Sequence, residues 1–298
     1  MDDLISVIMS TYNETVNEIE ASINSILHQS YTNIEFIIVI DNPNNHKLIN
    51  YIQSFKDSRI KIIKNNKNIG LVKSLNKAIA VSNGKYIARM DADDISEPNR
   101  LEHQKNNLEI RNLDIIGGNI ILINEKGEDF SKLSFPTDQS LLKFFLRWGN
   151  SLPHPTWMLK KEVYDKLNGY RNIPRCEDYD FICRALQNNY KIGNIDEFVL
   201  RYRIRRDSIS NSNKGAQYVV RRLISRNRKR GISEEKIYEY LNSVDFKNEL
   251  DAYEVFQELK SEIKAYPPNI KKVLMLVFNK NTYLLGCEKI CLKIRNFL

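Results

Sequence analysis

Residues Gly84–Arg100 read GKYIARMDADDISEPNR, and the rest of the chain is organised around this stretch. A short apolar strand, Tyr86–Met90, leads directly into three carboxylates, Asp91, Asp93 and Asp94. Open α/β sheets bind their ligands at the carboxyl ends of the strands, which is where these carboxylates fall. Side chains alternate along a strand, so Asp91 and Asp93 would point the same way if the strand continued.

So much negative charge at one edge of a sheet is unfavourable unless a cation balances it. A divalent cation that also holds a phosphate would do so, because hard cations take oxygen ligands from both groups. Asp is also common in ordinary turns, where its side chain bonds the nearby backbone. The acidic turn alone therefore leaves a metal site and a solvated turn as equal alternatives.

The composition is that of an ordinary soluble globular protein. The chain has 298 residues, a formal charge of +8, 42% hydrophobic and 28% charged residues. We see no signal-peptide pattern at the N-terminus and no run of 18 apolar residues, so we expect no transmembrane helix. The four cysteines lack zinc-site spacing, and we expect free thiols in a reducing cytosol: Cys176, Cys183, Cys287 and Cys291.

Strands and helices alternate four times before the acidic turn. Apolar runs predict strands at 4–9, 34–40, 60–63 and 86–90. Thr15 and Glu18 form a predicted capping box at the start of the first helix. This alternation predicts an α/β fold with a parallel, doubly wound sheet whose carboxyl edge gathers the polar turns. The first turn lacks a G-x-G-x-x-G pattern, which argues against a nicotinamide-binding domain.

The second half of the pattern is less regular. We expect strands and helices to continue to about residue 210, with a polar loop at 174–180, and helices only from about 215. We therefore divide the chain into a first half (1–100), a second half (101–212) and a helical extension (213–298). The predicted elements of the second half are helices at 98–110, 140–148, 160–167 and 181–187 and strands at 114–123, 156–159 and 198–204.

Five segments together resemble the family 2 glycosyltransferases, which have the GT-A fold, a Rossmann-like, mostly parallel sheet flanked by helices. The resemblance runs from about residue 5 to 210 and includes the family's DxD motif, here Asp91-Ala92-Asp93. Each segment is weak alone, but their common order and spacing make a specific signal. The segments are Ser6–Glu14, Glu35–Asp41, Asn68–Gly70 with Leu75-Asn76-Ala78, Gly84–Asp94, and Gly169-Tyr170 with Glu177–Asp180.

The resemblance implies that residues 1–100 are the nucleotide-sugar-binding half of a GT-A domain and residues 101–212 its acceptor-binding half. It also implies a role for each matching residue. Thr11, Tyr12 and Glu14 would lie at the nucleotide, with Asp41 near its base. Asp91 would contact the ribose and lie beside the metal, and Asp93 would bind Mn²⁺ or Mg²⁺ at the pyrophosphate. Asp178 would be the catalytic base. The acceptor side would include three further residues, His154, Trp157 and Glu177.

Two departures from the family pattern concern the donor. Ile40 stands where members often carry a first Asp, which weakens the assignment of uridine as the base. Arg205 stands where members often carry His, and an arginine cannot ligate a metal but can hold a phosphate. Arg203, Arg205 and Arg206 would then clamp the diphosphate, and a basic surface strand is the equal alternative. The alternative for His154 is a purely structural role, and the alternative for Trp157 is packing in the core.

The C-terminal region is strongly basic. Residues 215–298 carry 16 Lys and Arg against 10 Asp and Glu, which is +6 of the total. Residues 271–278 and 283–297 mix apolar and basic side chains at helical spacing. Such helices can lie on an anionic membrane, pack on the catalytic domain, or pack on a second subunit as in a homodimer.

We therefore predict a cytoplasmic, metal-dependent, inverting glycosyltransferase. If the basic C-terminal helices bind a membrane, the enzyme would lie at the inner face of the cell membrane. The donor would be a nucleotide diphosphate sugar, UDP-linked by resemblance. The acceptor would be a saccharide or lipid-linked saccharide in capsule, O-antigen or other polysaccharide synthesis. The alternatives are a non-catalytic nucleotide-sugar-binding subunit and a nucleotidyltransferase. We expect no nucleic-acid partner, although residues 221–230 are basic enough to attract one.

Overall fold

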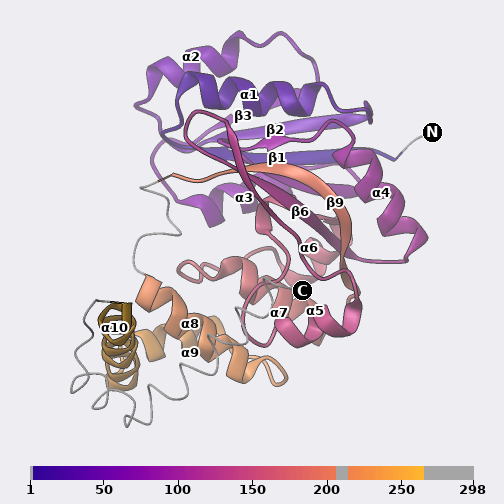
Figure 1. Ribbon diagram of the computed structural model, residues 1–298. Coiled ribbons are helices and arrows are strands. Elements are labelled where there is room, and N and C mark those ends of the chain that lie inside the picture. Colours follow the sequence, from indigo (N-terminus) through magenta and orange to yellow (C-terminus); the bar gives the residue numbers. More distant parts are fainter. Residues whose placement is uncertain (1–2, 206–213, 265–298) are drawn as a thin grey trace.

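One mixed sheet with helices on both faces forms the body of the protein (Figure 1). The computed structural model describes residues 3–205 and 214–264. Within them the strand order is β3-β2-β1-β4-β8-β6-β9-β5, with β7 paired to β6. The strands are β1 (Ile5–Thr11), β2 (Ile34–Ile40), β3 (Ile60–Lys64), β4 (Tyr86–Asp91), β5 (Ile95–Ser96), β6 (Ile115–Ile123), β7 (Asp129–Leu133), β8 (Met158–Lys160) and β9 (Ile192–Arg203).

The first four long strands are parallel, as the alternating pattern predicts. β1 pairs in parallel with β2 and β4, and β2 with β3. The sheet becomes mixed beyond β4, because the short β8 is antiparallel to both β4 and β6. β9 runs parallel to β6, and β5 pairs antiparallel with β9. This last pairing fastens the segment after the acidic turn to the far half of the sheet.

Two buried clusters lie on opposite faces of this sheet. Successive residues of β4 divide between them: Tyr86, Ala88 and Met90 in one and Ile87 in the other, as alternation along a strand requires. Helices α1, α2 and α4 cover the first face, and α3, α6, α7 and α8 cover the second. The helices are α1 (Val16–Leu27), α2 (His46–Ser54), α3 (Leu71–Ala80), α4 (Arg100–Ile110), α5 (Gln139–Phe145), α6 (Lys161–Leu167), α7 (Glu177–Gln187), α8 (Lys214–Asn227), α9 (Glu234–Leu241) and α10 (Val244–Lys264).

Several predicted boundaries of the second half were wrong. Residues 177–180 are not loop but the first turn of α7, whose amino end favours its three acidic residues. β9 begins at Ile192, not Phe198, because β6 supplies hydrogen-bond partners to a segment that reads as a turn. α4 begins at Arg100, after the short strand β5, so Pro98 lies before the helix. α5 ends at Phe145, and the predicted strand at 156 begins as a 3-10 turn, His154–Thr156.

The helices after residue 213 pack on the sheet domain. Val220 and Ile224 of α8 and Ile237 of α9 belong to the buried cluster that also contains residues of α7. α10 packs on α8 through Tyr253 and Phe256. In the described part of the chain, no helix has the length and hydrophobicity needed to cross a bilayer. The basic helices predicted at 271–278 and 283–297 lie outside the described residues.

The cysteines within the described residues agree with the prediction. Cys176 and Cys183 are buried free thiols. Burial raises the pKa of both, so each stays protonated near neutral pH. Cys287 and Cys291 lie outside the described residues.

Candidate active site

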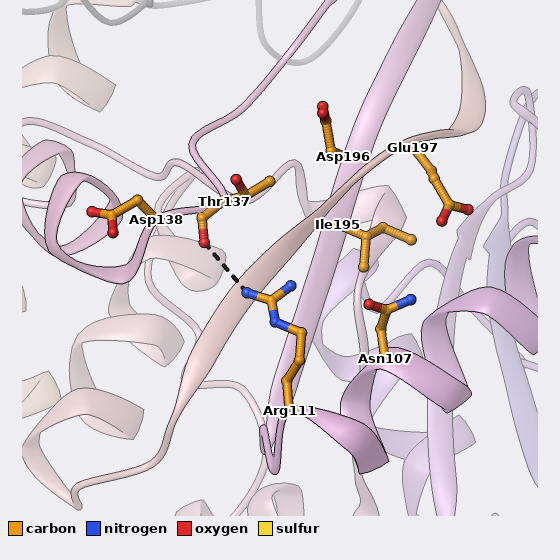
Figure 2. A pocket seen from close by; sticks show the side chains of 7 residues that line it. All are labelled: Asn107, Arg111, Thr137, Asp138, Ile195, Asp196 and Glu197. Atoms are coloured by element: carbon orange, nitrogen blue, oxygen red, sulfur yellow. Dashed lines mark hydrogen bonds between the residues drawn. The ribbon is translucent and has the colours of Figure 1, made fainter.

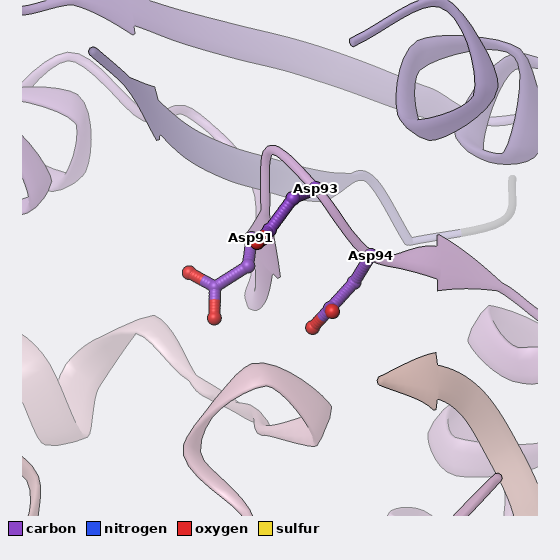
Figure 3. A group of neighbouring side chains, drawn as sticks. All are labelled: Asp91, Asp93 and Asp94. Carbon is purple, nitrogen blue, oxygen red and sulfur yellow. The ribbon is translucent and has the colours of Figure 1, made fainter. Parts of the chain in front are cut away.

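The acidic turn lies at the carboxyl end of the central strand β4. Asp91 is the last residue of the strand and pairs in register with Ser10 of β1. Asp91, Asp93 and Asp94 each place a carboxylate oxygen within 4.8 Å of the others (Figure 3). The three carboxylates are therefore clustered and Asp94 is buried, which differs from the solvated turn that the sequence also allows.

Arg203 of β9 holds the turn in place. Its backbone N–H donates to Asp94 Oδ1 at 2.8 Å, and its Nε donates to the carbonyl of Asp93 at 2.8 Å. Another guanidinium nitrogen donates to the carbonyls of Asn124 and Glu125, both at 3.0 Å. The sequence predicts a phosphate clamp of Arg203 with Arg205, but the Arg203 guanidinium donates to backbone carbonyls instead. Arg206 lies outside the described residues.

The surroundings of Asp93 and Asp94 disfavour the charged forms of their carboxyl groups. Asp94 is 1% exposed, and its Oδ2 is buried without a hydrogen-bond partner among the described residues. Burial and the neighbouring charges of Asp91 and Asp93 raise the pKa of Asp94 well above its ordinary value. Burial, followed by the charge of Asp91, raises the pKa of Asp93 to about 6. A positive ion at this turn would stabilise all three carboxylates.

This donor set fits a hard divalent cation. Mg²⁺ and Mn²⁺ prefer carboxylate oxygens, and one buried oxygen of the set has no other partner. A guanidinium already stands close by: Arg205 Nε lies 2.9 Å from Asp93 Oδ2 and its Nη2 lies 3.0 Å from Glu18 Oε2. Arg205 is thus placed beside the carboxylate at which a cation and a diphosphate would meet.

The loops after β1 and β2 lie beside the acidic turn. Thr11 and Tyr12 are held by Glu14, whose Oε2 accepts from Thr11 Oγ1 at 2.5 Å and from the Tyr12 N–H at 2.8 Å. Tyr12 is 42% exposed, so its ring is available to a ligand. Asn42 Nδ2 donates to Asn13 Oδ1 at 2.7 Å and joins the two loops.

Asp41 is occupied by the protein itself. It is 3% exposed, and its carboxylate accepts 2.9 Å hydrogen bonds from Asn65 Nδ2 and from the N–H groups of Ile69 and Gly70. It therefore orders the Asn68–Gly70 loop. A nucleotide base near Asp41 would contact the Asp41 backbone or the Asn68–Gly70 loop more readily than the Asp41 carboxylate.

The second acidic pair begins helix α7. Asn150 Nδ2 donates to Asp178 Oδ2 at 2.8 Å and so orients that carboxylate. Burial raises the pKa of Asp178, and burial with the charge of Asp178 raises the pKa of Glu177 to about 7. The charge of Asp91 is a smaller contribution to the raised pKa of Glu177, so the acidic turn lies within electrostatic range of the start of α7.

The structure places the remaining acceptor-side candidates below the surface. Trp157 is fully buried and its indole N–H donates to the carbonyl of Leu152 at 3.1 Å, so its ring has no face open to a sugar. The sequence expectation for Trp157 is corrected: it is a core residue. His154 is 9% exposed and its Nε2 lies 2.7 Å from the Tyr170 hydroxyl. Burial lowers the pKa of His154 well below its ordinary value, so it is neutral.

Two residues outside the predicted set also belong to the site. Asn150 carries no recognisable signal, because only the fold brings it to Asp178. Arg89 did have one: it lies two residues before Asp91 on the same strand and must share its face. Its guanidinium forms a two-point ion pair with Asp91 (2.5 and 2.7 Å) and is 3% exposed.

A surface hollow of about 490 Å³ lies elsewhere (Figure 2). Its lining includes Arg111 at the end of α4, Thr137, and Ile195–Glu197 near the start of β9. Arg203, which holds the acidic turn, is eight residues further along β9, roughly 25 Å at the rise of a strand. Arg111 is occupied by the carbonyls of Asn194 and Thr137, so the hollow offers no evident chemistry.

Comparison with known proteins identifies the family. The family model described as glycosyl transferase family 2 matches residues 6–168, more than half of the chain. The chain belongs to this family. Among its relatives, an uncharacterised glycosyltransferase of Methanocaldococcus jannaschii is 40% identical over 207 residues, covering 67% of this chain and 71% of the relative. The Escherichia coli O-antigen biosynthesis glycosyltransferase WbnJ is 36% identical over 215 residues, covering 70% and 83%.

The fold of this glycosyltransferase also has solved counterparts. Staphylococcus aureus TarS residues 1–349, in complex with UDP-GlcNAc, superposes with a TM-score of 0.60 at 17% identity, covering 86% of this chain and 80% of TarS. The likeness confirms the predicted GT-A fold. The protein is thus an enzyme of a sugar-transferring family, with relatives named for O-antigen and amylovoran biosynthesis.

Proposed function

We propose that this enzyme is a metal-dependent, inverting glycosyltransferase that uses a UDP-sugar. One observation carries the proposal: the clustered carboxylates of Asp91, Asp93 and Asp94 lie at the carboxyl end of β4, and a second acidic pair, 177–178, begins α7 in the other half of the chain. A transferase needs one such segment at the departing diphosphate and another at the incoming hydroxyl. The GT-A fold and the family membership support that division of roles.

The donor would bind at the carboxyl edge of β1, β2 and β4. Tyr12 and Thr11 would line the base pocket beside the Asp41 loop, and Glu14 would hold them there. Asp91 and Asp93 would hold Mn²⁺ or Mg²⁺, which when bound supplies positive charge to a leaving diphosphate. Arg205, already beside Asp93, would contact a phosphate oxygen.

The acceptor would bind on the side of α7. Asp178 would take the proton of the acceptor hydroxyl while that oxygen forms a bond to the anomeric carbon. The bond from that carbon to the diphosphate breaks on the opposite face, and the nucleoside diphosphate leaves with the electron pair. One displacement inverts the configuration. Asn150 would orient the base, and Glu177 and the neutral His154 would lie beside the acceptor.

The relatives suggest the setting. WbnJ is named for O-antigen biosynthesis, and a 37% identical Escherichia coli relative, matched over 125 residues, is named as transferring glucose from UDP-Glc to GlcNAc-diphosphoundecaprenol. We infer a saccharide or lipid-linked saccharide as acceptor in surface glycan synthesis. The enzyme would then work in the cytoplasm, at the inner face of the membrane when its acceptor is lipid-linked.

Calorimetric titration with UDP, with and without Mn²⁺, tests the donor and the metal. We expect UDP to bind at least about tenfold more tightly with Mn²⁺, and Asp93→Asn to abolish that gain, because a hard cation needs the carboxylate charge. Asp165→Asn, an exposed aspartate of α6, is the matched control. Equal UDP affinity with and without Mn²⁺ would contradict metal dependence.

Product analysis separates the remaining alternatives. UDP-glucose and UDP-N-acetylglucosamine are incubated with the enzyme and Mn²⁺, and the slow hydrolysis of each donor is followed. A transferase releases UDP, whereas a nucleotidyltransferase with a sugar phosphate and UTP releases pyrophosphate. A binding subunit would retain UDP affinity and release neither product.

A further inference from the structure

A buried arginine lies beside the acidic turn of the candidate site. Arg89 lies on β4, in register with Ile8 of the neighbouring β1, and is 3% exposed. Alternation along the strand places it on the face of Ile87, which is the face of the buried aromatic residues Trp157 and Tyr170. An apolar side chain is what such a position ordinarily holds.

Its contacts point towards Asp91. Both terminal nitrogens of the guanidinium engage the Asp91 carboxylate, one at 2.5 Å and the other at 2.7 Å. Two parallel bonds fix the plane of a carboxylate, which a single bond or a lysine cannot do. Arg89 Nε is buried without a hydrogen-bond partner among the described residues. The side chain is therefore committed to one partner, Asp91.

The same charge reaches the other acidic segment. Arg89 favours the ionised forms of Glu177 and Asp178 at the start of α7, and of Asp94 in the turn. It also disfavours protonation of His154. The charge of the buried Arg89 guanidinium thus acts on carboxylates of both segments, the one assigned to the donor and the one assigned to the acceptor.

Burying a charge in this way does not serve stability best. Replacing a buried ion pair by apolar groups of similar volume is often neutral or stabilising. A position between Ala88 and Met90 on a central strand could hold such a group. Stability alone therefore does not explain the guanidinium at this position, which points to a functional role.

Resting on the proposed function, we propose that Arg89 is a positioning residue for sugar transfer. Its guanidinium fixes the Asp91 carboxylate in the orientation that binds the nucleotide and metal. Arg89 acts through Asp91 and does not itself contact the donor.

A double-mutant cycle tests this role. UDP affinity in the presence of Mn²⁺ is measured by calorimetry for wild type, Arg89→Lys, Asp91→Asn and the double variant. We expect Arg89→Lys to weaken UDP binding about tenfold in wild type, which is the size of one charge-assisted hydrogen bond, and less than about twofold in the Asp91→Asn background. A merely structural arginine would weaken binding by the same factor in both backgrounds and would overturn the proposal.

Two controls make the cycle decisive. Arg59 forms a similar two-point pair with Asp57, two residues away and remote from the site, so Arg59→Lys should leave UDP affinity unchanged. Thermal unfolding with circular dichroism establishes that each variant is folded, and Arg89→Gln replaces the lysine variant in the cycle if the latter is not. Failure of the wild type to bind UDP would overturn the proposed function, whereas a binding wild type with an additive cycle overturns only the role of Arg89.

Discussion

Asp178 has the surroundings of a residue that handles protons. It begins α7, it is held by Asn150, and burial raises its pKa. A carboxylate with a raised pKa is a better proton acceptor near neutral pH than an exposed one. Its neighbour Glu177 titrates with it, so the pair and not one residue sets the pH behaviour of this side of the site.

We expect Asp178→Asn to lower kcat for sugar transfer about a thousandfold, because general-base catalysis contributes on that scale. UDP affinity with Mn²⁺ should stay within about twofold, since the metal-binding turn is untouched. Transfer assays and calorimetry on the same preparation check both parts. Asp196→Asn, an aspartate of β9 bonded to Asn119, is the control. Full transfer activity in Asp178→Asn would remove it from the role of base.

Glu177 makes folding stability depend on pH. Its pKa rises from an ordinary 4.5 to about 7 in the folded protein, so the folded state binds this proton more tightly than the unfolded chain does. That contribution is present in full below pH 4.5 and is lost as the pH rises through 7. At pH 8 the folded wild type carries a buried charge that a glutamine would not carry.

The variant Glu177→Gln should therefore gain Tm relative to wild type as the pH rises from 5 to 8, by a few degrees. Thermal unfolding in metal-free buffer at several pH values measures the difference. Glu162→Gln, an exposed glutamate in the first turn of α6, should show a constant difference. A Tm difference for Glu177→Gln that falls with pH would have the wrong sign.

At the scale of the element, α1 shows how local sequence supports the site. Thr15 caps the helix, and Glu18 accepts from the Thr15 N–H at 2.8 Å and from its hydroxyl at 2.7 Å. The predicted capping box is thus confirmed. Glu18 also lies 3.0 Å from Arg205, so the start of α1 is tied to the acidic turn.

Removing the cap should loosen this helix. We expect Thr15→Ala to lower the free energy of unfolding by about 1 kcal/mol, because an amide at the helix start loses its side-chain partner. Urea unfolding followed by circular dichroism measures it. Thr15→Ser keeps the hydroxyl and should lie within about 0.5 kcal/mol of wild type. Equal losses for both substitutions would show that the methyl group, and not the cap, matters.

At the scale of the whole molecule, the helices after residue 213 are part of the main core. Ile224 of α8 is 2% exposed and belongs to the same buried cluster as Ile182 of α7. Because α7 carries Glu177 and Asp178, α8 supports the helix that presents them. Residues 214–258 thus pack on the sheet domain. The three alternatives for the helices expected at 271–278 and 283–297 concern residues outside the described part of the chain.

We expect Ile224→Ala to lower stability by about 2–4 kcal/mol, the usual cost of a cavity in a packed core. The whole molecule should still unfold in one transition, seen by calorimetry and by near-UV circular dichroism. Val244→Ala at the start of α10 is the control, since Val244 is 70% exposed. A separate early transition in Ile224→Ala, with the sheet domain intact, would show that the helical extension is an independent domain.

Local patterns determined much of this protein in advance. The alternation of apolar runs predicted the parallel strands and the covering helices of the first half, because periodicity reports which face of each element is buried. The Thr15 cap and the position of the acidic turn after β4 were equally local. The order of five motifs along the chain predicted the family and the GT-A fold, both of which the comparisons confirm.

Only the tertiary structure decided what each side chain does within that frame. It committed Asp41 to the Asn68–Gly70 loop, buried Trp157, and gave Arg203 to backbone carbonyls. It also brought Asn150 to Asp178 and buried the Arg89 side chain. These outcomes depend on partners tens of residues away. The burial and the electrostatic surroundings of a side chain are set by all its neighbours in space. A local sequence pattern contains no information about neighbours that are distant along the chain.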